Sequence, residues 1–178
     1  MLCAISGVVL SYPLRGLLPA VTELKNEKRF IYNGGRFPDP GISPVTYQQE
    51  FFQLELDLES EVFYSLRKEN DIKPYSINQC NTEELQSIKK FFESNRNSFF
   101  FLFDNERLVG SILLLKNYIQ CLCVARNYQR KGYGTKLTKY AVNYAFDKEY
   151  NSIELSTLPG NIDAEQLYRK LGFHELQT

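Results

Sequence analysis

Hydrophobic residues recur every three or four positions in four segments of the chain, which is the spacing of an amphipathic helix. The longest segment starts near Ser43, which can cap a helix, and Pro44, which suits its first turn, and it ends near Asn70. Its repeating positions are Tyr47, Phe51, Leu54, Leu58, Val62 and Leu66. Three shorter helices are predicted over residues 85–92, with Asn81 or Thr82 as the cap, over residues 137–145, and over residues 164–171, which Gly172 closes.

Short runs rich in aromatic and β-branched residues predict strands around these helices. The runs are residues 3–10, 29–32, 75–79, 98–103, 108–115, 119–124 and 152–157. The polar residues 104–107 join two of them as an antiparallel hairpin, whereas the helix after residues 119–124 requires a parallel, right-handed crossover to residues 152–157. A mixed α/β sheet is therefore expected, with a ligand crevice at the carboxyl ends of its parallel strands.

Residues 33–44 concentrate Gly, Pro, Asn and Asp, which interrupt periodic structure and predict a loop. We expect three parts along the chain: an N-terminal extension that ends in this loop (residues 1–42), the long amphipathic helix (residues 43–70) and the main domain (residues 71–178).

Composition narrows the classes of function that such a sheet can serve. Among the 178 residues, 21 Lys and Arg balance 21 Asp and Glu, so the chain lacks the overall positive field that draws proteins to nucleic acids or anionic membranes. The apolar residues 2–10 have no basic segment before them and are too short for a membrane span, which disfavours secretion and membrane insertion.

The cysteines give information about location and metals. Four cysteines, unevenly spaced, do not make a disulfide framework, and this favours a reducing cytoplasm. Cys121 and Cys123 form a C-x-C pair, but no second Cys or His pair stands at ligand spacing and His174 is the only histidine. No metal site is predicted.

The strongest chemical signal follows the strand at residues 119–124. There the sequence Q-R-K-G-Y-G, residues 129–134, precedes a predicted helix. Glycines at positions 132 and 134 let the backbone approach a ligand, and the helix start offers N–H groups at the positive end of its dipole. The nucleotide-binding patterns G-x-x-x-x-G-K-[ST] and G-x-G-x-x-G are absent from the sequence. Taken alone, the loop fits a phosphate site and a solvated turn equally well.

Two motifs in this order resemble the GNAT family of N-acetyltransferases. The first, Q-x-x-G-x-G at residues 129–134, resembles the family's loop for the pyrophosphate of acetyl-CoA. The second, N-x-x-A-x-x-L-Y-x-x-x-G-F, occupies residues 161–173. The resemblance covers residues 75–176, and it implies an α/β fold with a mixed, mostly antiparallel sheet in which a central, splayed parallel strand pair is flanked by helices.

The chain departs from the family pattern in two places. Only one helix fits between residues 75–79 and residues 98–103, where the family commonly has two, so residues 43–70 are a candidate for the vacant place. The chain also ends five residues after Phe173, which is too short for the usual terminal strand hairpin. The last part of the sheet is then missing, swapped, or supplied by residues 1–32.

The resemblance implies acetyl-CoA as the cosubstrate and assigns residues to it. The backbone of the strand at residues 122–124 would bind the pantetheine arm, and the loop and helix start at residues 129–135 would bind the pyrophosphate. The cofactor-binding candidates are Leu122, Cys123, Val124, Gln129, Arg130, Lys131, Gly132, Tyr133, Gly134, Thr135 and Asn161.

The implied reaction is direct attack of a primary amine on the thioester in a ternary complex. By resemblance, Tyr168 is the catalytic candidate, because a phenol with a reference pKa near 10 stays protonated and can donate to the departing thiolate. A tyrosine that only packs on the apolar face of its helix is the alternative. The general base is open, since the strand before the loop offers Gln120 and two cysteines. Glu154 and a water chain are the candidates for it.

Two other classes of function compete with this interpretation. One is a catalytically silent CoA-binding module, which the missing acidic base favours. The other is a nucleic-acid-binding domain that uses the basic stretch at residues 126–139, and the zero net charge disfavours it. The sequence identifies neither the amine acceptor nor the oligomeric state, and it leaves both a monomer and a homodimer open.

Overall fold

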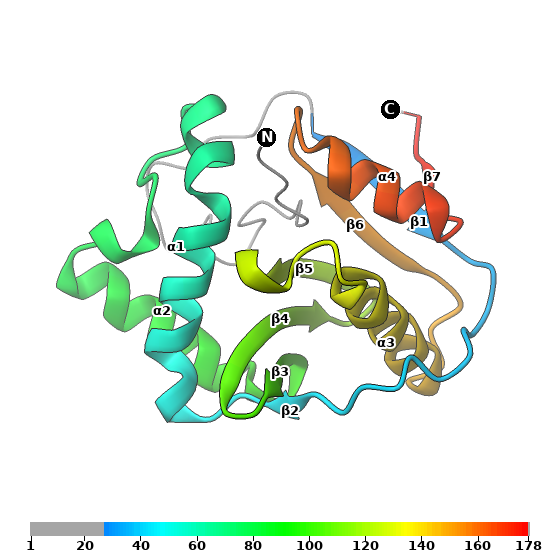
Figure 1. The fold of residues 1–178 in the computed structure, drawn as a ribbon, viewed down its shortest axis with the longest axis horizontal. Helices are drawn as coiled ribbons and strands as arrows, with labels where there is room; N and C mark the ends of the chain where they lie inside the picture. Colours follow the sequence, from blue (N-terminus) through cyan, green and yellow to red (C-terminus); the bar gives the residue numbers. More distant parts are fainter. Residues whose placement is uncertain (1–26, 178) are drawn as a thin grey trace.

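The computed structural model describes residues 27–177, which form a seven-stranded mixed sheet between two layers of helices (Figure 1). The strands are β1 (Lys28–Tyr32), β2 (Val45–Thr46), β3 (Phe99–Asp104), β4 (Arg107–Leu115), β5 (Tyr118–Val124), β6 (Ile153–Thr157) and β7 (His174–Glu175). The helices are α1 (Phe52–Glu69), α2 (Thr82–Ser94), α3 (Tyr133–Asp147) and α4 (Ile162–Lys170). The order in the sheet is β2-β3-β4-β5-β6-β1-β7. The predicted fold class is confirmed, because among the strands of residues 27–177 only β5 and β6 pair in parallel.

The chain's N-terminal part completes the sheet. β1 lies antiparallel to β6 along its whole length and pairs with β7 on its other edge. Phe30 anchors it, because its side chain is completely buried against the ring of Tyr168, and Lys28 and Arg29 form ion pairs with α4 and β6. Of the three sequence-based alternatives for the end of the sheet, the structure selects supply by residues 1–32. The predicted strand at residues 3–10 lies outside the described part of the chain.

Two buried clusters pack on opposite faces of the sheet. α1 and α2 cover one face, toward which β5 directs Cys121 and Cys123, whereas α3 and α4 cover the other face, toward which β5 directs Leu122 and Val124. This alternation is the two-residue period of a strand. The α1 helix packs beside α2 on the same face of the sheet, and so it takes the place of the second helix that the family commonly has before the strand at residues 98–103.

The start of the long helix was predicted too early. Val45–Thr46 is an edge strand that pairs with β3, and Tyr47 is buried against Phe99 and Phe101 rather than on a helix. The helix begins only at Phe52, after one turn of 3₁₀ helix. The helical spacing upstream was coincidental, because pairing with β3 satisfies the backbone there.

The predicted strand at residues 75–79 was also wrong, since Ile77–Gln79 forms a 3₁₀ turn. Its polar side chains bind α1: the Ser76 hydroxyl donates to Ser60 Oγ at 2.9 Å, and Asn78 Nδ2 donates to Asp57 Oδ1 at 2.9 Å. The predicted cap of α2 is confirmed at Asn81, where Asn81 and Glu84 form a reciprocal capping box.

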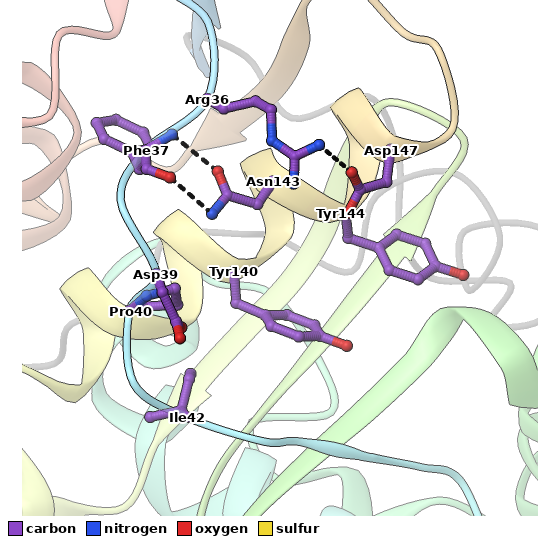
Figure 2. A pocket seen from close by; sticks show the side chains of 9 residues that line it. All are labelled: Arg36, Phe37, Asp39, Pro40, Ile42, Tyr140, Asn143, Tyr144 and Asp147. Carbon is purple, nitrogen blue, oxygen red and sulfur yellow. Dashed lines mark hydrogen bonds and ion pairs between the residues drawn. The ribbon is translucent and has the colours of Figure 1, made fainter.

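The loop predicted at residues 33–44 crosses the outside of α3 (Figure 2). Asn143 exchanges two hydrogen bonds with the backbone of Phe37, at 2.8 and 3.0 Å, and Arg36 pairs with Asp147. Between loop and helix lies an open pocket of about 370 Å³, which Tyr140 helps to line. It borders the C-terminal half of α3, away from the glycine loop at the helix start. Within residues 27–177, no helix is long and apolar enough to cross a membrane.

Candidate active site

The two parallel strands at the centre of the sheet pair only at their beginning. Tyr118 and Ile119 of β5 lie opposite Glu154 and Leu155 of β6, and no further β5 residue has a partner on β6. The Tyr118 hydroxyl donates to Ser156 Oγ at 2.6 Å across this paired end. Beyond it, β6 does not pair with the edge of β5 that faces it, which is the splayed arrangement that the family resemblance implied.

Backbone direction decides which of the three predicted β5 residues face this edge. The Ala125 N–H donates to the Val109 carbonyl, on the β4 side. Because N–H and C=O groups alternate in direction along a strand, those of Cys123 also face β4, and those of Leu122 and Val124 face β6. The Val124 carbonyl accepts from Gln129 Nε2 at 2.9 Å. Leu122 and Val124 are therefore the β5 residues whose backbone can bind a ligand in the gap.

The glycine loop leads directly from β5 into α3. Gly132 has a φ of 85°, in the left-handed region that favours glycine, while a Cβ there would meet no atom of the chain within 4 Å. Backbone conformation, rather than space, thus requires this glycine. Gly132 is the N-cap of α3, and within the described residues no side chain accepts a capping hydrogen bond there. The backbone N–H groups of the first turn, from Tyr133 to Thr135, therefore have no capping acceptor. This helix start can bind an anion.

The basic side chains near the loop have different environments. Arg130 donates to Asp163 of α4 at 3.1 Å, which links the loop to the second motif, and Lys131 lies over the ring of Tyr128. Arg126 donates to the backbone carbonyl of Glu61 on α1 at 2.8 Å. Lys131 is thus exposed at the loop, whereas Arg126 is directed toward α1.

The second motif forms α4, and it places Tyr168 in the interior. The ring of Tyr168 packs against Phe30 and Phe173, and its side chain is completely buried. Its hydroxyl has no hydrogen-bond partner among residues 27–177. Burial raises the pKa of Tyr168 well above its usual range, and nearby Cys121 and Cys123 raise it further. A buried hydroxyl without a partner costs free energy, which a ligand atom that accepts its hydrogen bond would recover.

The remaining sequence candidates lie beside this point. Asn161, 4% exposed, precedes α4, and its carbonyl accepts from the Glu165 N–H. Glu154, a candidate base, forms an ion pair with Arg29 of β1 at 2.9 Å. That contact engages Glu154 in holding the sheet together.

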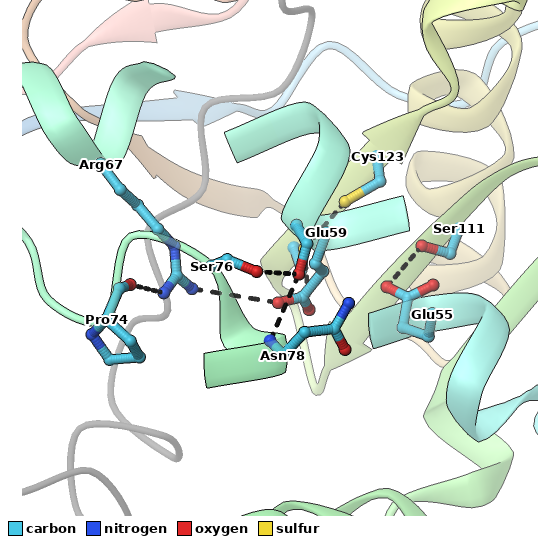
Figure 3. Close-up of polar contacts among 10 residues, drawn as sticks. Glu55, Glu59, Arg67, Pro74, Ser76, Asn78, Ser111 and Cys123 are labelled. Atoms are coloured by element: carbon cyan, nitrogen blue, oxygen red, sulfur yellow. Dashed lines mark hydrogen bonds and ion pairs between the residues drawn. The ribbon is translucent and has the colours of Figure 1, made fainter. Parts of the chain in front are cut away.

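Sequence reasoning missed a buried polar cluster between α1 and the sheet (Figure 3). Glu55, Glu59 and Arg67 of α1 are 0%, 2% and 5% exposed, whereas Leu54, predicted on the apolar face, is 42% exposed. The Ser111 hydroxyl of β4 donates to Glu55 at 2.8 Å. Glutamates four residues apart on a helix with an apolar stripe were the available signal, but such residues usually face solvent.

The same cluster includes the C-x-C pair. Ligand atoms of Glu55, Cys121 and Cys123 all lie within 4.8 Å of one another. The hydrogen bond to Cys123 lowers the pKa of Cys121, but burial and the two glutamates raise it, to about 11, and burial raises that of Cys123. A metal would have to displace both thiol protons close to the Arg67 guanidinium. The absence of a metal stays a prediction.

A parallel strand pair that separates beside a helix start able to bind an anion, with a completely buried tyrosine on the next helix, fits an acyl-CoA-binding fold. The model of the acetyltransferase (GNAT) family matches residues 44–173, and the chain belongs to this family. N-alpha-acetyltransferase 30 of Schizosaccharomyces pombe is 29% identical over 83 residues, which cover 42% of this chain and 55% of that protein.

Solved structures show the same fold. A GCN5-related N-acetyltransferase from Sphaerobacter thermophilus aligns with a TM-score of 0.64 at 17% identity, over 84% of this chain and 48% of that one. A GNAT-family acetyltransferase from Colwellia psychrerythraea aligns with a TM-score of 0.64 at 14% identity, over 84% of this chain and 52% of that one. The chain therefore spans about half the length of these relatives.

Proposed function

We propose that this chain is an acetyl-CoA-dependent N-acetyltransferase that transfers an acetyl group to a primary amine by direct attack in a ternary complex. The observation that carries the proposal is the buried Tyr168 hydroxyl, which lacks a partner in the described structure and belongs to the same buried cluster as Leu122, at the unpaired edge of β5. Neither an unpaired strand edge nor a buried hydroxyl without a partner stabilises the protein in the absence of a ligand. Both would be satisfied by a thioester whose carbonyl oxygen accepts from the backbone and whose sulfur accepts from a phenol.

The chain's residues would divide the binding of acetyl-CoA between two elements. The N–H groups of Leu122 and Val124 on β5 would bind the pantetheine arm and the thioester carbonyl, which polarises that carbonyl for attack. The first turn of α3, with Gly134 at its centre, would bind the pyrophosphate, and exposed Lys131 would add positive charge. The bound cosubstrate supplies an activated acetyl group. Tyr168 then holds a proton where the leaving sulfur would lie.

The acceptor class is the least determined part of the proposal. The name of the fission yeast relative, N-alpha-acetyltransferase 30, refers to an α-amine, and it supports peptide N-termini as the first acceptors to test. A catalytically silent CoA-binding module is the alternative, and one observation favours it: β5 carries no acidic residue that could serve as a base.

The test has a binding part and a turnover part. Acetyl-CoA and CoA should raise the melting temperature, since a ligand bound only by the native state adds about 2.7 kcal/mol at a hundredfold excess over Kd. ATP and NAD at equal concentration should not. An amine panel of peptide N-termini, lysine peptides and small amines, read by thiol release, then identifies the acceptor. No response to CoA would refute the proposal, and binding without turnover on any amine would favour the silent module.

A further inference from the structure

The buried cluster on α1 is incompletely paired. Glu59 is 2% exposed, and its Oε2 atom lies 4.0 Å from the nearest guanidinium nitrogen of Arg67, outside hydrogen-bond range. Arg67 instead donates at 2.9 Å to the backbone carbonyl of Pro74. Glu59 Oε2 has no hydrogen-bond partner among residues 27–177, and the same holds for Glu55 Oε2. Buried carboxylates are normally fully hydrogen-bonded, so both glutamates call for an explanation, and they differ in what their other oxygen contacts.

Glu59 lies against the strand that borders the proposed reaction centre. The Cys121 thiol of β5 is 3.8 Å from Glu59 Oε1, and Leu122, the next residue, has its N–H on the edge facing β6. Tyr168 of α4 belongs to the buried cluster on the opposite face of the sheet, together with Leu122. A carboxylate thus contacts Cys121 from the α1 layer, and a phenol lies in the buried cluster of the opposite layer, which holds the next residue, Leu122.

We propose that Glu59 is the general base of the reaction, which accepts the proton that the amine loses. This inference rests on the proposed function. The acceptor ammonium gives one proton to the Glu59 carboxylate, and the nitrogen lone pair forms the C–N bond at the thioester carbonyl. The C–S bond breaks with its electron pair on sulfur. Tyr168 donates its proton to that sulfur and regains one from the nitrogen, and Glu59 releases its proton to solvent, so that one proton is released per turnover.

The electrostatic environment of Glu59 suits this role. Burial raises the pKa of Glu59 to about 7, while the Arg67 charge and the Cys121 thiol oppose the rise. Burial and the neighbouring Glu59 charge raise the pKa of Glu55 well above its usual range, and the hydrogen bond from Ser111 opposes this rise. The groups facing Glu59 are Glu55 and Arg67 of α1, Cys80 before α2, and Cys121 and Cys123 of β5. A base works best when its pKa is near the working pH.

The first experiment compares two matched variants, Glu59→Gln and Glu55→Gln. Both remove a buried carboxyl group from the same helix face, but Cys121 donates its hydrogen bond to Glu59, whereas Glu55 accepts from Ser111. Glu59→Gln should lower kcat/KM about 10²-fold or more, with the Kd for acetyl-CoA unchanged. Glu55→Gln should stay within a few-fold of wild type, because Glu55 is hydrogen-bonded to Ser111 of β4 and not to β5. Equal effects of the two variants would overturn the assignment.

The second experiment needs no variant, so it holds even where Glu59→Gln fails to fold. The acid limb of the wild-type kcat/KM profile should lie near pH 7, and it should not move between two accepted amines of different pKa. A limb that follows the amine's own pKa would overturn the role of Glu59 and leave the proposed function intact. Wild-type protein that binds no acetyl-CoA and acetylates no amine would instead refute the proposed function itself.

Discussion

Tyr168→Phe separates catalysis from packing, because the two predict changes of opposite sign. The substitution keeps the ring against Phe30 and Phe173 and removes a hydroxyl that is fully buried and lacks a partner in the described structure. Without acetyl-CoA the variant should be more stable, since an unsatisfied buried polar group costs about 1–3 kcal/mol. For a chain of this size, each kcal/mol gained in the free energy of unfolding raises Tm by roughly 2–4 °C.

Turnover should change in the other direction. If Tyr168 protonates the departing sulfur, kcat should fall about 10²-fold or more, or at least about 2.7 kcal/mol of transition-state stabilisation. The loss should shrink with an acyl donor whose thiol has a lower pKa, because that leaving group needs less protonation. Since burial raises the pKa of Tyr168 well above its usual range, the phenol should not titrate within the working pH range.

Tyr47→Phe is the matched control. Tyr47 is also buried, at 2% exposure, and its hydroxyl also lacks a partner among residues 27–177, but it packs under α2, in the cluster on the face opposite α4. Differential scanning fluorimetry should show both variants at or above the wild-type Tm, whereas steady-state kinetics should show a loss for Tyr168→Phe alone. The reasoning is refuted if Tyr168→Phe has the wild-type kcat on every donor while chemistry limits the rate.

Three further predictions concern the loop, the sheet and the buried glutamate. Gly134 lies in a helical turn and does not need a positive φ, so Gly134→Val should fold. Calorimetry should show that this variant binds acetyl-CoA at least about tenfold more weakly, and unchanged affinity would place the pyrophosphate elsewhere. Phe30→Ala should cost about 3–5 kcal/mol in urea unfolding, since Phe30 is completely buried, and a cost below about 1 kcal/mol would contradict its role as the anchor of β1. Burial raises the pKa of Glu59 from 4.5 to about 7, so its contribution to the free energy of unfolding is present below pH 4.5 and is lost as the pH rises through 7, by about 3 kcal/mol. Urea unfolding of Glu59→Gln should not show this loss. Parallel pH profiles of the variant and the wild type would contradict the prediction.

Local patterns predicted the parts of the fold that local interactions determine. The hairpins through β3, β4 and β5 follow from alternating apolar runs with short polar turns, and the α2 start follows from Asn81 and Glu84, three residues apart. The early start of the long helix was wrong because Val45–Thr46 pairs with β3, more than 50 residues later. Such pairing cannot be read from the spacing of nearby residues.

The candidate site divides in the same way. The glycine loop and Tyr168 carry motifs, and the sequence was sufficient to select them. Glu55 and Glu59 resemble solvated surface residues, and their burial depends on Ser111 and Cys121 in strands far along the chain. The role of residues 28–32 depends on pairing with β6, more than 120 residues away. Non-local contacts of this kind are what the structure adds.

The central claim is that acetyl transfer from CoA to an amine takes place where β5 and β6 separate. The most direct test measures thiol release and amide formation in the same reaction, with acetyl-CoA and the accepted amine. The account predicts one thiol for each acetylated amine, with both products reduced in parallel by Tyr168→Phe and unaffected by Tyr47→Phe. Thiol release without amide, or bound acetyl-CoA that no amine consumes, would contradict it.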